Sequence, residues 1–280
     1  MNRNLHEIKD FMINVSFKAG EIIKKFREEN ELNISTTHKS KSQIVTPADL
    51  ASEKAIIEEI LKKFPNDKIL SEETSKDLKD DIFTENYWVI DPIDGTTSYR
   101  YGSNNCSVSM GYMEEGEIKI GIIYIPFTGE TYLAIKNEGA FYSNKNNNFK
   151  KFMCPNNVPV SEAVIGLGWP QEGEIQGYLG IYKYISENFL DYYRAAGATI
   201  DMCQVAKGIL HGYYETSLAP WDVAAAFLIL KEAGAKVSFL NEPKDKKVPR
   251  DIYSKNVLVT PANIHDEIFK AFSEIINRTI

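Results

Sequence analysis

Trp88-Val89-Ile90-Asp91-Pro92-Ile93-Asp94-Gly95-Thr96-Thr97 joins an apolar run to two carboxylates and a glycine turn. The apolar run predicts a strand that delivers Asp91 and Asp94 at its C-terminal end. Gly95 permits close backbone approach, and the threonines after it supply hydroxyl and N–H groups at a predicted helix start. Carboxylate and carbonyl oxygens suit Mg²⁺, and N–H groups after a glycine suit phosphate. Taken alone, the string also fits an ordinary Asp-Gly turn.

Three further carboxylates stand at the ends of predicted elements. Glu72 follows a short apolar strand, Asp222 lies in the first turn of a predicted helix, and Asp49 follows the helix cap Thr46 by three residues. By itself, each has an ordinary explanation as a turn acid or a helix cap. Their occurrence together with the first string favours a metal-dependent phosphate site.

The composition is that of a folded globular chain of 280 residues, with 43% apolar and 25% charged residues. The net charge is −7, from 39 acidic and 32 basic residues. Nucleic-acid binders carry a basic excess, so this balance argues against a nucleic-acid partner, and it also argues against an anionic membrane. An anionic substrate would need local compensation, which divalent metal ions usually supply.

The cysteines and histidines disfavour two other kinds of site. Cys106, Cys154 and Cys203 are widely spaced, unlike a disulfide framework or a CxxC clip. The four histidines are scattered, unlike a zinc site. The N-terminal segment is amphipathic and charged, and no window offers 18 apolar residues, so we expect neither a signal peptide nor a membrane span. These features predict a cytoplasmic protein.

The first half of the chain predicts an α+β arrangement. Apolar residues at steps of three and four between Leu5 and Phe26 predict a long one-faced helix. Thr46-Pro47-Ala48-Asp49 predicts the start of a second helix, with Thr46 as cap and Pro47 at the first position. Strands are predicted at 68–70, 87–90, 107–113, 117–125 and 131–135.

The second half predicts an α/β arrangement. The polar, asparagine-rich stretch 144–157 predicts a break. We therefore expect an N-terminal α+β domain at 1–145, with most of the metal ligands, and a C-terminal α/β domain at 146–280, with the substrate pocket and Asp222. Strands and helices alternate after the break. Strands are predicted at 164–167, 213–215, 236–240 and 257–260, and helices at 174–187, 201–208, 221–233 and from 262 onward.

At several separated places the chain resembles the inositol monophosphatase family of Mg²⁺-dependent, Li⁺-sensitive phosphatases. The string at 88–97 matches the family's first signature without departure. The other matching motifs are Val45-Thr46 through Asp49, Ser71-Glu72-Glu73, and Trp221-Asp222-Val223-Ala224-Ala225-Ala226 with Glu232-Ala233-Gly234-Ala235. The resemblance implies an α/β fold, a layered αβαβα sandwich similar to the sugar phosphatase fold, with the active site between the halves.

The resemblance also implies a set of metal ligands. Two or three Mg²⁺ ions would bind in one active site, where they activate water and neutralise the phosphate. The expected ligands are Glu72, Asp91 and the Ile93 carbonyl for the first ion, and Asp91, Asp94 and Asp222 for the second. A weaker third ion is expected near Glu72.

The catalytic and phosphate-binding groups are expected beside these ligands. The resemblance implies that Thr96, hydrogen-bonded to Asp49, orients the attacking water, assisted by Glu72. The backbone N–H groups of Gly95 and Thr96 would bind phosphate oxygens. The implied reaction is direct in-line attack of metal-activated water on a phosphate monoester, without a covalent phosphoenzyme.

Substrate choice is expected to depend on the second half. Counted back from the second signature without gaps, Ala196, Gly197 and Ala198 fall where the family's backbone lines the sugar pocket. Glu215 falls where a carboxylate accepts from a substrate hydroxyl, although it also fits an exposed acid at a strand end. Residues 196–199 read Ala-Gly-Ala-Thr, where family members usually show Gly-Ser-Ala-Ala or Gly-Thr-Ala-Ala.

Two other segments leave substrate preference open. The loop at 38–43 carries Gln43 where family members have an acid, which bears on the affinity for a third metal ion. Trp169 fits either stacking on a ring such as adenine or simple packing.

We expect hydrolysis of inositol 1-phosphate or a related sugar-alcohol monophosphate. The alternatives are a broad sugar-phosphate, fructose 1,6-bisphosphate or NADP(H) phosphatase on the same metal site. The string Asp-Gly-Thr-Thr-Ser-Tyr at 94–99 disfavours the 3′-phosphoadenosine 5′-phosphate branch, which usually has Asp-Gly-Thr-Lys-Glu-Phe. A protein that binds a phosphate ligand without turnover is disfavoured because all the expected metal ligands are present. The resemblance further implies a homodimer.

Overall fold

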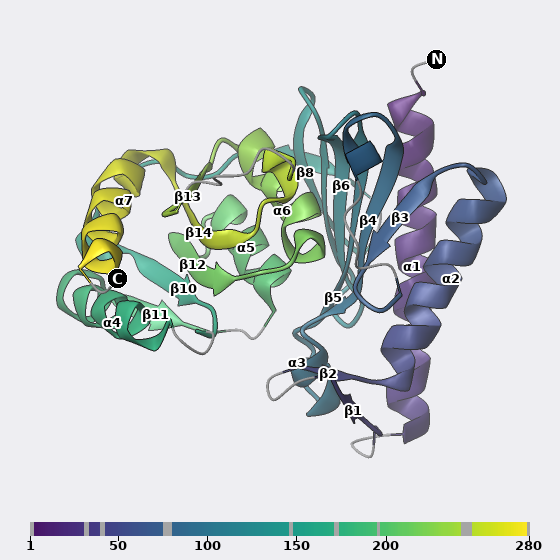
Figure 1. Ribbon diagram of the computed structural model, residues 1–280, viewed down its shortest axis with the longest axis horizontal. Helices are drawn as coiled ribbons and strands as arrows, with labels where there is room; N and C mark the ends of the chain where they lie inside the picture. Colours follow the sequence, from purple (N-terminus) through teal and green to yellow (C-terminus); the bar gives the residue numbers. More distant parts are fainter. Residues whose placement is uncertain are drawn as a thin grey trace.

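The computed structural model describes residues 3–30, 34–39, 43–74, 80–145, 148–170, 174–194, 197–241 and 248–278. Two sheets and three layers of helices alternate in it, in the order helix, sheet, helix, sheet, helix (Figure 1). The expected αβαβα sandwich is therefore confirmed. Within these described ranges, no helix is long and apolar enough to cross a bilayer.

The first outer layer consists of α1 (Leu5–Asn30) and α2 (Pro47–Lys63), which pack on one face of the first sheet (Figure 1). The buried residues of α1 recur mainly at steps of three and four from Ile8 to Ile23, as an amphipathic helix requires. Thr46 and Asp49 form the predicted capping box at the start of α2. This box fixes where α2 begins, and with it the position of the Asp49 carboxylate.

The first sheet has seven strands in the order β3-β4-β5-β6-β7-β8-β9. β3 and β4 are parallel, and the other neighbours are antiparallel. The strands are β3 (Lys68–Ser71), β4 (Asn86–Asp94), β5 (Ser107–Glu114), β6 (Glu117–Ile125), β7 (Glu130–Ile135), β8 (Gly139–Asn144) and β9 (Lys150–Phe152). Sequence analysis did not predict β8.

Strand β9 lies inside the stretch 144–157, where we expected an irregular break. That expectation is wrong for 150–152, because these residues pair with β8. The strand has no apolar alternation, since it lies exposed at the sheet edge, and so it gave no strand signal. The first sheet thus takes its last strand from beyond residue 145, and the division into 1–145 and 146–280 stays a prediction.

The second sheet has five strands in the order β11-β10-β12-β14-β13. These strands are β10 (Val164–Leu167), β11 (Asp191–Tyr193), β12 (Gly212–Ser217), β13 (Lys236–Phe239) and β14 (Lys255–Thr260). The parallel strands β11, β10 and β12 lie beside the antiparallel pair β14 and β13. Sequence analysis missed β11, another exposed edge strand. The outer layer on this side consists of α4 (Ile175–Asn188) and α7 (Ala262–Asn277) (Figure 1).

The central layer consists of α5 (Ala198–Lys207) and α6 (Pro220–Ala233), between the two sheets (Figure 1). Residues 223–230 of α6 are all buried, as expected of a helix with a sheet on each side. Gly121 of β6 lets α6 approach closely, because a Cβ there would lie 2.7 Å from the Ala225 carbonyl oxygen. This approach brings the first turn of α6 to the end of β4.

Short elements complete the fold. They are β1 (Thr37–His38), β2 (Ile44–Val45), α3 (Thr96–Arg100) and three 3₁₀ turns at Asp80–Phe83, Val160–Glu162 and Arg250–Ile252. The strands β1 and β2 form an antiparallel pair beside α3 (Figure 1).

Candidate active site

Strand β4 supplies two buried carboxylates at its C-terminal end. Asp91 is 2% exposed and Asp94 is 7% exposed. In a regular strand, residues three apart face opposite sides of the sheet. The pairing of β4 with β5 shifts register between Asp91 and Asp94, and the Ile93 N–H donates to Asp91 Oδ1 at 3.0 Å. This irregularity at Pro92 lets both carboxylates meet on one side.

The third carboxylate comes from the other half of the chain. Asp222 lies in the first turn of α6, where its Oδ2 accepts from the Ala219 N–H at 2.7 Å. One carboxylate oxygen from each of Asp91, Asp94 and Asp222 lies within 4.8 Å of the others. The structure therefore brings together three of the expected metal ligands.

The carboxylates of the acidic cluster repel one another when they are ionised. Burial, followed by the charges of Glu72, Asp222 and Asp94, raises the pKa of Asp91 well above its usual value. Burial and the charge of Asp94 likewise raise the pKa of Asp222. Burial also raises the pKa of Asp94, against hydrogen bonds that lower it. A buried set of hard oxygen donors whose charges repel one another fits a divalent cation such as Mg²⁺.

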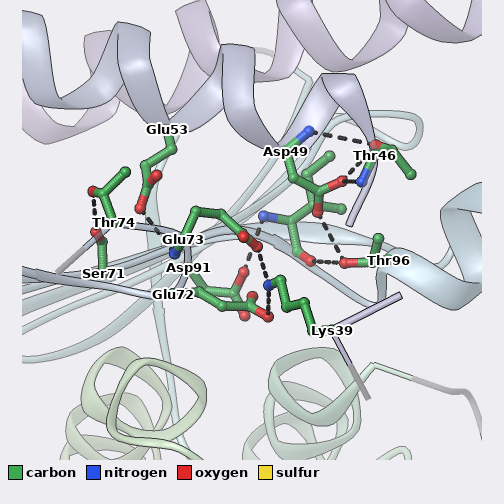
Figure 2. A network of polar contacts seen from close by, with 11 residues as sticks. Lys39, Thr46, Asp49, Glu53, Ser71, Glu72, Glu73, Thr74, Asp91 and Thr96 are labelled. Carbon is green, nitrogen blue, oxygen red and sulfur yellow. Dashed lines mark hydrogen bonds and ion pairs between the residues drawn. The ribbon is translucent and has the colours of Figure 1, made fainter. Parts of the chain in front are cut away.

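Glu72 lies beside Asp91 but is bound to a lysine (Figure 2). The Lys39 ammonium donates to Glu72 Oε1 at 2.9 Å and also to Glu73 Oε1. The Glu73 backbone N–H donates to the buried Glu53 carboxylate at 3.1 Å. Sequence analysis gave Lys39 no role, because the contact depends on how the β1–β2 pair lies against the end of β3.

Thr96 and Asp49 form the expected hydrogen-bonded pair (Figure 2). The Thr96 hydroxyl lies 2.9 Å from Asp49 Oδ1 and 3.0 Å from the Ile93 carbonyl oxygen, and it can donate its one proton to either. Asp49 Oδ2 accepts from the Thr46 N–H at 2.8 Å and from the Thr46 hydroxyl at 2.5 Å. Burial raises the pKa of Asp49 to about 6, although hydrogen bonds from Thr46 and Thr96 lower it.

Gly95 caps the short helix α3 with a φ of 85°, in the left-handed region that glycine adopts without strain. The backbone N–H groups at the start of a helix have no partner within it. The first N–H groups of α3, beginning with that of Thr96, therefore have no acceptor within the helix.

The expected pocket segment lies at the start of α5. Gly197 is the residue before the helix, and Ala198 is the first helical residue. A Cβ at Gly197 would lie 3.2 Å from Asp94 Oδ2, so glycine permits close approach to this carboxylate. Ala196, the third predicted pocket residue, lies outside the described residues.

Glu215, the remaining expected pocket residue, belongs to β12. It accepts from the Trp169 N–H at 3.2 Å and from the Tyr213 hydroxyl. Burial raises the pKa of Glu215 to about 7, although the hydrogen bonds from Tyr213 and Trp169, and then the charge of Arg194, lower it. The Trp169 side chain is exposed, so this tryptophan is not a core residue. The Arg194 guanidinium lies over its ring, 5.1 Å from the ring centre.

Comparisons with known proteins agree with this geometry. A family model described as the inositol monophosphatase family matches residues 4–277. The chain is 33% identical over 240 residues to the Nus factor SuhB of Pasteurella multocida, which covers 85% of this chain and 86% of that protein. It is 30% identical over 234 residues to the fructose-1,6-bisphosphatase/inositol-1-monophosphatase of Thermotoga maritima, covering 83% of this chain and 84% of the relative.

The fold agrees as well. The structure of a Thermotoga maritima IMPase superposes with a TM-score of 0.82 at 26% identity, covering 98% of this chain and 100% of that one. The motif resemblance is thereby confirmed, and the chain belongs to the inositol monophosphatase family.

Proposed function

We propose that this chain hydrolyses a small phosphate monoester with Mg²⁺, and that inositol 1-phosphate is its best substrate. The observation that carries the proposal is the meeting of Asp91 and Asp94 with Asp222 from the other half of the chain, within 4.8 Å. Thr96, on the turn that follows Asp94, is hydrogen-bonded to Asp49 of α2. Family membership supports phosphatase activity, and the substrate is our inference.

The residues present fit two divalent cations. Glu72, Asp91 and the Ile93 carbonyl would hold one, and Asp91, Asp94 and Asp222 the other; a third would depend on Glu72. When bound, Mg²⁺ supplies a Lewis acid that lowers the pKa of water and offsets phosphate charge. The Lys39 ammonium holds Oε1 of Glu72, so among the bonds of the described residues Oε2 is the oxygen left to act as such a ligand.

Thr96 is suited to orient a water molecule. Its one proton is used by Asp49 or by the Ile93 carbonyl, so its lone pairs remain to accept a hydrogen bond from water. Asp49 keeps the Thr96 hydroxyl in this orientation because the Asp49 carboxylate is itself held by hydrogen bonds from Thr46. The N–H groups of Gly95 and Thr96 bind phosphate oxygens at the start of α3.

The pocket favours a polyol leaving group. In this proposal, Gly197 and Ala198 at the start of α5 contribute to the leaving-group pocket, and the Glu215 carboxylate on β12 binds a substrate hydroxyl. A pKa of about 7 lets Glu215 accept from, or donate to, a sugar hydroxyl near neutral pH. Its charge also disfavours a second phosphate at that position.

Fructose 1,6-bisphosphate is the second candidate. The relative from Thermotoga maritima is named for both fructose-1,6-bisphosphatase and inositol-1-monophosphatase activity. In this chain, Arg194 lies over Trp169 next to Glu215, and it provides a cation that a second phosphate would favour. The same cation suits the additional phosphates of NADP(H).

Phosphate release from a substrate panel tests the proposal. Inositol 1-phosphate, fructose 1,6-bisphosphate, NADP and 3′-phosphoadenosine 5′-phosphate are compared with Mg²⁺ and with EDTA, and Asp91→Asn serves as the inactive control. We expect Mg²⁺-dependent turnover that is fastest with inositol 1-phosphate. A different leading substrate would overturn the pocket assignment and keep the metal site. Absence of turnover throughout the panel would contradict the proposed activity.

A further inference from the structure

Thr199 lies in the first turn of α5 and has no exposed surface. Its backbone N–H donates to Asp94 Oδ2 at 2.9 Å, and its hydroxyl lies 2.5 Å from the same oxygen. The neighbouring Ala198 N–H donates to Asp94 Oδ1 at 3.2 Å. Thr199 is also the last residue of the string that departs from the family's usual pattern, where alanine stands. The proposed function assigns this hydroxyl no role.

The Thr199 hydroxyl is itself hydrogen-bonded to a second hydroxyl, that of Ser107. Ser107 Oγ lies 2.6 Å from Thr199 Oγ1, and Ser107 is fully buried. Ser107 is also the residue of β5 that pairs directly with Asp94 of β4. An ionised carboxylate can only accept, so the Thr199 proton goes to Asp94 and the Ser107 proton goes to Thr199. The chain of hydroxyls therefore has one direction, and both hydroxyls depend on the Asp94 charge.

These bonds determine which part of Asp94 is free. Oδ2 accepts from both the N–H and the hydroxyl of Thr199, which uses its two lone pairs. Oδ1 accepts only from the Ala198 N–H among the bonds of the described residues, and so keeps one lone pair. Asp94 is thus arranged to present a single oxygen to a cation shared with Asp91 and Asp222.

We propose that Thr199, supported by Ser107, is a positioning residue that holds Asp94 with one oxygen directed at the metal site. The arrangement also joins the two halves of the molecule, because Asp94 and Ser107 belong to the first sheet and Thr199 to α5. Cation binding at Asp94 therefore depends on the same helix turn that carries Gly197 and Ala198. This inference rests on the proposed metal site.

Outer hydrogen-bond partners of metal ligands affect affinity for the metal, whereas a merely structural hydroxyl affects only stability. The experiment therefore measures equilibrium binding of Mn²⁺ without substrate, from the electron paramagnetic resonance signal of the free ion. Mn²⁺ prefers the same oxygen ligands as Mg²⁺. Circular dichroism establishes that each variant is folded at the temperature of the titration.

Thr199→Val keeps the shape of the side chain and removes its hydroxyl. We expect Mn²⁺ affinity to fall about 10-fold, at the lower end of the range for such partners of metal ligands. Thr199→Ser restores the wild-type affinity because it restores the donor. The matched control is Thr131→Val, the same exchange at a buried threonine of β7, a strand without any of the three cluster carboxylates, and we expect it to leave affinity unchanged.

Ser107→Ala removes only the donor behind Thr199, and we expect a smaller loss of Mn²⁺ affinity with the fold retained. If Thr199→Val fails to fold, this variant decides the question. Wild-type affinity in the folded Thr199→Val variant, or in Ser107→Ala when the valine variant is unfolded, overturns the positioning role. Absence of Mn²⁺ binding by the unmodified chain would instead overturn the metal site of the proposed function. Mn²⁺ binding without phosphate release would overturn only the proposed activity.

Discussion

Asp49 and Asp222 hold the same place in two different helices. Each is the third residue of its helix, each follows a proline in the first turn, and each accepts from the backbone N–H before that turn. The residues before the two helices have closely similar backbone angles, with φ and ψ of −113° and 163° at Thr46 and −101° and 164° at Ala219. The local sequence signal is therefore nearly identical.

The difference lies in the remaining partners. Asp49 accepts from the hydroxyls of Thr46 and Thr96 as well, so both of its oxygens are engaged. Asp222 accepts from the Ala219 N–H, and its other partners in the cluster are the carboxylates Asp91 and Asp94. The same cap thus serves two purposes: a fully bonded carboxylate orients a hydroxyl, and a sparsely bonded one is free to hold a cation.

Among the variants that test this comparison, Asp222→Asn should cause the largest loss of phosphatase activity. The amide oxygen still accepts from Ala219, so α6 keeps its cap, but the cluster loses one charge. We expect phosphatase activity to fall about 10³-fold, as when one electrostatic stabiliser is removed from an active site. Steady-state kinetics over a Mg²⁺ series measures this, with circular dichroism as the control for folding. Activity within a few fold of wild type would exclude Asp222 as a ligand.

Asp49→Asn should have a smaller effect of a different kind. The amide oxygen can serve Thr46, and the amide NH₂ then faces the Thr96 hydroxyl and donates to it. Thr96 loses the lone pair proposed to accept from water, and we expect kcat to fall about 10²-fold through misorientation. Affinity for Mn²⁺ should stay at the wild-type value, in contrast to Asp222→Asn. A parallel loss of metal affinity would show that Asp49 acts on the cluster instead.

Asp49 and Asp222 should also differ in how each contributes to the pH dependence of the free energy of unfolding. Both have a pKa raised in the folded chain, mainly by burial, so the folded state retains protons that the unfolded state has released. Stability is then greatest below the unfolded pKa of about 4 and falls as pH rises through the folded pKa. For Asp49 the loss is complete above its pKa of about 6. For Asp222, whose pKa is raised well above its usual value, the loss continues to higher pH.

Urea unfolding in EDTA between pH 4 and 8 tests whether the free energy of unfolding falls as the pH rises. We expect the unmodified chain to be less stable at pH 8 than at pH 5. Asp222→Asn should flatten the decline above pH 6, whereas Asp49→Asn should flatten it only below pH 6. Saturating Mg²⁺ should reverse the trend, because the metal binds the deprotonated carboxylates. Stability in EDTA that rises with pH would contradict the crowding of charge in the cluster.

Sequence analysis recovered the features whose signals are local. The periodicity of α1, the box formed by Thr46 and Asp49, and the position of Asp222 in the first turn of α6 are encoded within a few residues. The strands β9 and β11 escaped prediction because both are exposed edge strands, where no buried face imposes alternation.

The missed site contacts are long-range. Thr199 lies 105 residues from Asp94, and Lys39 lies 33 residues from Glu72. No spacing rule connects such pairs, because each contact depends on the packing of separate layers. The departure of residues 196–199 from the family's usual string was the available signal for Thr199, but nothing in the sequence indicated which carboxylate its hydroxyl would reach.

The smallest expected effects are the changes in stability caused by substituting the two cap residues, Thr46 and Ala219. Thr46 caps α2 with its side chain, whereas Ala219 has no side-chain oxygen to offer α6. Because the backbone angles before the two helices are alike, a serine at position 219 can adopt the capping geometry. We expect Ala219→Ser to stabilise the chain by about 0.5–1 kcal/mol and Thr46→Val to destabilise it by about 1–2 kcal/mol, both by urea unfolding in EDTA.

Activity separates these two variants more sharply than stability does. Thr46→Val removes a partner that fixes Asp49 and should therefore lower kcat through Thr96. Ala219→Ser adds a donor and acceptor next to Asp222 without removing any bond that Asp222 makes, so its kcat should stay near that of the unmodified chain. If both variants changed kcat equally, the two carboxylates would be acting alike, and the proposed difference between an orienting cap and a ligand cap would not hold.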